Sequence, residues 1–136
     1  MKRALIALAV TASVLAAATT RAEAAATVSA QVDSVATVTS QVTTVFDFDL
    51  YNCPPGLDIA IVEWEAHQPS RPESFAGSGF QPYGLSNGDP VQHLTLITGS
   101  AAFLPGEQWI GSGTIACGAV LIPVEGHGTT QSLNGV

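Results

Sequence analysis

Positive charge is the scarcest feature of this sequence. The 136 residues include four lysines and arginines against eleven aspartates and glutamates, which gives a formal net charge of −7. A chain with so few cations cannot neutralise a phosphate backbone or an anionic membrane surface. The composition therefore excludes nucleic acid as a partner. The negative net charge favours solubility, and the excess of acidic residues could attract cationic molecules.

Long apolar runs are also missing beyond the N-terminus, so no later segment is expected to remain in a membrane. The first residues are different, because a short basic start, MKR, precedes the uncharged run ALIALAVTASVLAAA and then a polar stretch with small residues. This order is typical of a signal peptide. We predict a signal peptide over residues 1–24, cleaved after Ala24 or alternatively after Ala26, and a secreted, extracellular domain over residues 25–136.

Cleavage after Ala24 would leave 136 − 24 = 112 residues, the size of a single domain. One basic and ten acidic residues would remain, for a net charge of 1 − 10 = −9. Arg71 is then the only arginine or lysine. We expect this domain to be a monomer.

Cysteine is rare as well, with one residue at position 53 and one at position 117. An even number of cysteines in an exported chain indicates a disulfide. The bond Cys53–Cys117 would span 117 − 53 = 64 residues, for which the chain-entropy model gives about 4 kcal/mol. His67, His93 and His127 form no metal-ligand spacing with the cysteines, and we predict neither a metal nor a cofactor.

A helical period is absent, and alternation with period two takes its place. From Val28 to Leu50 the even positions are mostly apolar and the odd positions mostly polar, which predicts β-structure with one buried face. The run is too long for one ordinary strand, so we expect breaks near Ser34 or Ser40. The segment 58–68 predicts another strand, with Trp64 on its apolar side.

Cys53 does not follow the apolar phase of the strand that ends near Leu50. Two explanations are open. A β-bulge at Tyr51 and Asn52 would move Cys53 into the core phase. Alternatively, the strand has already ended before Cys53, and the disulfide links the two cysteines at the rim of the fold.

Residues 69–90 are rich in proline, glycine and serine, which predicts a long loop with at most a short edge strand near residues 74–80. The aromatic residues Phe75, Phe80 and Tyr83 lie within it. Aromatic side chains on a stiff loop are good contact anchors, so this loop is the candidate binding site. The competing interpretation is that these rings only cover one end of the fold.

Further strands are expected over residues 91–98 and 109–124, the latter with a bend or hairpin near Gly118. About seven short strands in a domain of this size favour an antiparallel β-sandwich over a barrel. Trp64 follows Cys53 by eleven residues and Cys117 comes late, which is the order of the immunoglobulin fold.

Four segments, VDSVATVT, YNCPPG, AFLPGEQW and TIAC, are spread over most of the predicted mature chain. They resemble segments of small, uncharacterised secreted bacterial proteins with an immunoglobulin-like β-sandwich fold. The resemblance implies that fold, but these motifs are turn and strand residues and imply no active site. Many members of that group carry a further cysteine near the position of Ser86, which this chain lacks.

The sequence gives only weak signals for catalytic or metal-binding residues. Glu63, Glu65 and His67 share one face of the predicted strand, as the carboxylate pair of a hydrolase would. An open strand face supplies no apolar surround for a general acid, so we predict no catalytic residues. Calcium at Asp47, Asp49 and Asp58 would need a ligand loop that the sequence lacks.

The predicted function is therefore that of a non-catalytic binding module whose partner is an extracellular protein or a small molecule. Three further functions are weighed against it: a carrier of a small apolar molecule, a secreted inhibitor of a foreign hydrolase that inserts residues 69–90, and a hydrolase that uses Glu63 and Glu65. The carrier has precedent in acidic immunoglobulin-like proteins of similar size, whose two short-span disulfides this chain lacks.

Overall fold

The computed structural model describes residues 27–54, 56–86 and 88–133. The predicted signal peptide and both predicted cleavage points, after Ala24 and Ala26, lie outside the described residues. Those residues form eight β-strands and no helix, which confirms the all-β class. None of them belongs to a helix that is long and apolar enough to cross a membrane.

The strands follow the alternation of the sequence, and the long N-terminal run is broken at both expected places. In chain order the strands are β1 (Ser29–Val32), β2 (Val35–Ser40), β3 (Thr43–Tyr51), β4 (Ile59–Gln68), β5 (Arg71–Gly84), β6 (Val91–Ala101), β7 (Gln108–Cys117) and β8 (Val120–Ser132). The predicted hairpin near Gly118 is the β7–β8 turn, where Gly118 has a φ of 64°.

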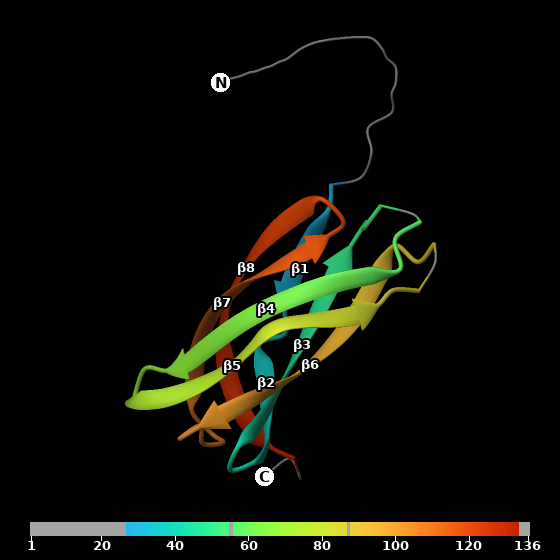
Figure 1. Cartoon of the computed structure of the whole chain (residues 1–136). Helices are drawn as coiled ribbons and strands as arrows, with labels where there is room; N and C mark the ends of the chain where they lie inside the picture. The colour runs from blue at the N-terminus through green and yellow to red at the C-terminus, as the bar shows by residue number, and fades with distance from the viewer. Residues whose placement is uncertain (1–26, 55, 87, 134–136) are drawn as a thin grey trace, which may run out of the picture.

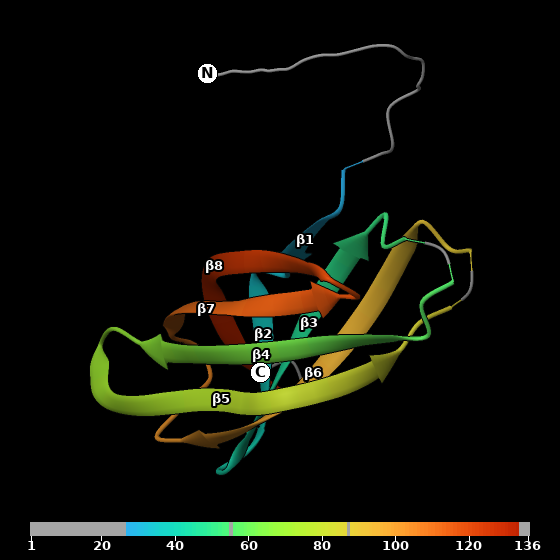
Figure 2. The same cartoon turned by 45° about the horizontal axis from the view of Figure 1, so that its top comes forward.

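The strands close into a seven-stranded barrel, with β1 and β2 sharing one position beside β3. The sheet order is β1-β3-β2-β8-β7-β4-β5-β6, and β3 pairs in addition with β6 along its whole length, from Thr43 to Tyr51. Figures 1 and 2 show β7, β4 and β5 side by side, with β2, β3 and β6 behind them. All pairings are antiparallel except that of β2 with β8.

The predicted immunoglobulin-like sandwich is therefore wrong. A sandwich keeps two separate sheets, whereas here β5 pairs with β4 on one side and, at Phe75, Ala76 and Gly77, with β6 on the other. Together with the β3–β6 pairing, this contact joins the two halves into a closed surface. Counting strands could not separate the two architectures, because both contain short alternating strands around one core.

The predicted loop over residues 69–90 is also wrong, because most of it is the fourteen-residue strand β5. Pro72 lies at the beginning of that strand, where a missing N–H costs little. Pro82 lies opposite Ile61 of β4, in the part of β5 for which no pairing with β6 exists among the described residues. Proline is tolerated at such a strand edge because it removes no ladder hydrogen bond there.

The interior of the barrel is filled by aromatic rings. Trp64, Trp109, Phe46, Phe48 and Phe103 are all at most 2% exposed. Trp64 makes edge-to-face contacts with Phe46, Phe48 and Trp109, at centroid distances of 5.5, 5.0 and 6.0 Å. A seven-stranded barrel is narrow enough for side chains to occupy its lumen, so this core holds the curved wall on which the surface features lie.

The predicted disulfide is present, and it joins Cys53 to Cys117 at a Cα–Cα distance of 5.9 Å. Of the two explanations for the phase of Cys53, the ended strand is correct. β3 stops at Tyr51, and Asn52 has a φ of 61°, in the left-handed region that asparagine tolerates. The N–H of Asn52 donates to the carbonyl of Pro90 at 2.8 Å, and this turn brings the partly buried Cys53 to the fully buried Cys117.

Candidate functional site

The outer faces of β5, β4, β7 and β8 form one continuous surface, seen in succession in Figure 2. Strand register places Gly77, Glu65, Ser112 and Glu125 in one row across these four strands. His67, Ile110 and His127 form the next row over β4, β7 and β8. Residues that are remote in the sequence therefore share one patch of the barrel wall.

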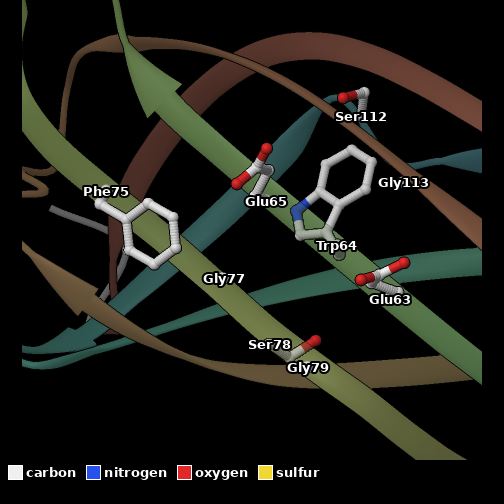
Figure 3. Close-up of a pocket in the computed structure, with 9 residues that line it drawn as sticks. All are labelled: Glu63, Trp64, Glu65, Phe75, Gly77, Ser78, Gly79, Ser112 and Gly113. Atoms are coloured by element: carbon white, nitrogen blue, oxygen red, sulfur yellow. The ribbon is translucent and has the colours of Figure 1, made fainter.

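Two adjoining hollows lie on this surface, with volumes of about 440 and 760 Å³. Both are lined by Glu65, Phe75 and Ser112, so we treat them as one site and call it the outer groove. Figure 3 shows the first hollow, with Phe75 and Ser78 on β5 and the two glutamates of β4 around Trp64. The remaining residues of the groove are Glu63, Ala66, His67, Gly77, Gly79, Ile110, Gly111, Gly113, Glu125, Gly126 and His127.

Phe75 is a half-exposed ring in this groove, with 48% of its surface accessible. Its position depends on Gly77, because a Cβ at residue 77 would come 2.6 Å from Phe75 Cζ. The ring thus covers the backbone of the glycine two residues further along the same strand. An aromatic face held in this way is available for stacking or for contact with a cation.

Trp64 supports the groove from inside the barrel. It is 1% exposed, and its indole ring lies against β7 at Gly111, where a Cβ would come 2.5 Å from Trp64 Cζ2. Gly113 is the register partner of Trp64. The missing side chains of these two glycines make room for the large indole ring, which is why a tryptophan fits at this point of the wall.

Two polar atoms beneath the groove have no hydrogen-bond partner among the described residues. They are Trp64 Nε1 and Ser78 Oγ, both buried. The residues are register partners on β4 and β5, and Figure 3 shows the indole nitrogen on the side of the ring toward Glu65 and Phe75. A buried polar group without a partner costs free energy, and these two atoms lie beneath the floor of the groove. By contrast, Trp109 Nε1 donates to the carbonyl of Thr129 at 3.1 Å.

The groove is acidic, and the only basic side chains among its lining residues are those of His67 and His127. Glu63, Glu65 and Glu125 are exposed, and within residues 27–54, 56–86 and 88–133 none of them has a hydrogen bond or an ion pair. Arg71, the only arginine or lysine in that part of the chain, pairs with Glu73 at 3.4 Å and donates from Nε to the carbonyl of Ala102 at 3.0 Å. These unpaired carboxylates make the electrostatic potential at the groove negative.

The described part of the chain holds no group of three or more histidine, cysteine, aspartate or glutamate residues arranged for a metal ion. The acidic residues of β3 already have partners. Asp47 accepts a hydrogen bond from Thr95 Oγ1 at 3.1 Å, and Asp49 Oδ1 lies 2.5 Å from His93 Nδ1. Asp58 precedes β4, outside the groove.

The three aromatic residues predicted to form a binding loop are not brought together. Phe75 lines the groove, whereas Phe80 is 74% exposed at a bulge in β5 outside it. Tyr83 is the register partner of the buried Ala60 and packs against the core. Burial raises the pKa of the Tyr83 phenol. One of the three therefore contributes to the candidate site.

Glu63, Glu65 and His67 lie on one outer strand face, as their alternation predicts. Sequence reasoning missed the other half of the groove, namely Ile110, Ser112, Glu125 and His127. Alternation along β7 and β8 identifies these residues as outward-facing. Only the register among the three strands β4, β7 and β8 shows that they lie beside Glu65.

Comparison of this chain with protein-family models, with curated proteins and with solved structures gives no match.

Proposed function

We propose that this protein is a secreted, non-catalytic binding module that holds its ligand in the outer groove. One observation carries the proposal. A half-exposed phenyl ring, fixed over Gly77, lies beside unpaired carboxylates and above two buried polar atoms that lack partners. Binding sites typically combine such an apolar surface with a few convergent polar groups. The disulfide is compatible with an extracellular location.

Exposure of the carboxylates supports binding over catalysis. Glu63 and Glu65 lie on the solvent side of β4, whereas a general acid needs an apolar surround that keeps its proton at neutral pH. A carrier of a small apolar molecule would need space inside the barrel, which the aromatic core occupies. An inhibitor that inserts residues 69–90 would need a loop where the chain forms β5.

The proposal is tested by two-dimensional ¹H–¹⁵N spectra of the labelled protein. Maltotriose, a neutral alanine-rich peptide and an arginine-rich peptide serve as probes of three chemical kinds. We expect at least one probe to shift the amides of Glu65, Gly77 and Ser112 together with the indole N–H of Trp64. The indole N–H of Trp109 is the internal control, because it is already bonded to Thr129.

Shifts confined to residues outside the groove, or no shifts with any of the three probes, would contradict the proposed function. Turnover of a glycoside, ester or peptide substrate that is lost in Glu63→Gln or Glu65→Gln would contradict its non-catalytic part.

A further inference from the structure

The outer groove presents negative charge that no arginine or lysine in the described part of the chain balances. Its three glutamates are unpaired, and Arg71 is engaged by Glu73 and by the carbonyl of Ala102. A second copy of the chain would bring no free arginine or lysine from its described residues either. Self-association through this groove would therefore place like charges together, which is unfavourable. Charge complementarity calls for a cationic partner.

The spacing of the carboxylates calls for more than one cation. Glu63 and Glu65 are two residues apart on β4, which corresponds to about 6.5–7 Å along a strand. Glu65 and Glu125 lie two strands apart in register, which corresponds to about 10 Å between their Cα atoms. A single small amine can contact only one of these three carboxylates. An extended peptide repeats its side chains on one face every second residue, with the same spacing as Glu63 and Glu65.

One further group fits a peptide that carries arginine. Phe75 offers its ring face beside the carboxylates, and a guanidinium group both stacks on such a ring and forms a fork of hydrogen bonds to a carboxylate. Trp64 lies inside the barrel beneath this part of the wall, so its indole N–H signal reports on the groove without touching the peptide.

We infer that the outer groove binds an extended segment of another protein that carries arginine at alternate positions. This inference rests on the proposed function and specifies its ligand. Glu63, Glu65 and Glu125 pair with the cations, and Phe75 stacks on one guanidinium group.

The test uses the disulfide-bonded protein and three probes. The first is acetyl-Arg-Ala-Arg-Ala-Arg-amide, the second is the same peptide with citrulline in place of each arginine, and the third is putrescine. Citrulline keeps the shape of arginine and removes its charge. Affinities are measured by calorimetry at low and high salt, and the binding site is identified from the indole N–H signal of Trp64.

We expect the arginine peptide to bind at least about tenfold more tightly than the citrulline peptide, since each exposed ion pair contributes up to about a factor of five. Its binding should weaken at high salt, because exposed charges are screened. The double variant Glu65→Gln/Glu125→Gln should weaken binding by about three- to tenfold on the same basis. Asp47→Asn, which removes one charge from the opposite wall of the barrel, should leave binding unchanged.

Equal affinity for the arginine and citrulline peptides would overturn the inference, as would putrescine binding as tightly as the arginine peptide. Binding of maltotriose or of the neutral peptide in the groove, without binding of the arginine peptide, would overturn it too but leave the proposed function intact. Absence of binding in the groove by every probe would refute both. The salt dependence and the citrulline comparison use the unaltered chain, so they remain decisive if the double variant fails to fold.

Discussion

The phenyl ring of Phe75 lies so close to Gly77 that a Cβ at residue 77 would come 2.6 Å from its Cζ atom. This contact within one strand holds an aromatic side chain on the outer face of the barrel and shapes the groove beside it. It also makes Gly77 a position at which one methyl group changes the surface without entering the core.

Gly77→Ala should displace the Phe75 ring and destabilise the protein by no more than about 1 kcal/mol, below the usual cost of overpacking a core, because the exposed ring can swing away. Urea unfolding measures the change in stability, and ring-proton shifts of Phe75 report the displacement. Gly79→Ala is the matched control on the same strand, because a Cβ there meets nothing within 4 Å. Equal effects of the two substitutions would contradict the contact.

The disulfide between Cys53 and Cys117 should supply a large part of the stability. Reduction, or the double substitution Cys53→Ser/Cys117→Ser, should cost about 2–5 kcal/mol, because the open chain regains the entropy of a long loop. Urea unfolding with and without dithiothreitol measures the difference. The double variant should not respond to dithiothreitol, and a natural chain that is equally insensitive would contradict this assignment.

Gln68 is fully buried and connects β4 to the turn before β7. Its Nε2 donates to the carbonyl of Leu104 at 2.7 Å, and its Oε1 accepts from the N–H of Leu104 at 2.9 Å. Gln68→Glu loses the donor and places a charge in the interior, so we expect a loss of about 3 kcal/mol or more at neutral pH.

Acid should partly reverse the defect of Gln68→Glu. Burial raises the pKa of a carboxyl group, so protonation on lowering the pH removes the buried charge and restores a donor. The stability difference from the natural chain, measured by urea unfolding at several pH values, should therefore shrink as the pH falls. A difference that is independent of pH would contradict the burial of this side chain.

The partly buried Tyr83 should make the stability of the protein depend on pH in the alkaline range. Burial raises the pKa of its phenol in the folded state, so the folded protein holds the proton more tightly than the unfolded chain does. The resulting stabilisation is fully present below the ordinary tyrosine pKa, about 10. It is lost as the pH rises through the higher folded-state value.

Tyr83→Phe should remove this component of the alkaline loss, whereas Tyr51→Phe, at the other tyrosine, should leave it in place. Urea midpoints measured from neutral to strongly alkaline pH provide the comparison. Identical alkaline profiles for Tyr83→Phe and the natural chain would show that Tyr83 is not the group responsible.

Much of the local structure could be predicted because it depends on neighbouring residues alone. The alternation around Phe46 and Phe48, and the apolar side of β4 with Trp64, correctly indicated which side chains point inward. β5 was missed because its proline and glycine residues are typical of loops. Its strand conformation depends on hydrogen bonding with β4, to which a short turn joins it, and, over Phe75–Gly77, with β6. The residue pattern of β5 alone does not reveal these pairings.

Half of the outer groove was predictable for the same reason. Glu63 and Glu65 share a face because successive strand residues point to opposite sides. Nothing local to β7 or β8 relates Ser112 and Glu125 to Glu65. That relationship requires the register of three strands, which the curvature and packing of the barrel impose.

The sequence by itself determined the all-β class, the inward and outward faces of most strands and the pairing of the two cysteines, because side-chain alternation and the cysteine count are properties of the chain alone. Only the tertiary structure decided that the sheet closes into a barrel, that β5 is a strand and that Phe75 shares a groove with Glu125. These features depend on which strands meet and in what register, and that choice is made by packing around the aromatic core and by hydrogen bonds between distant segments.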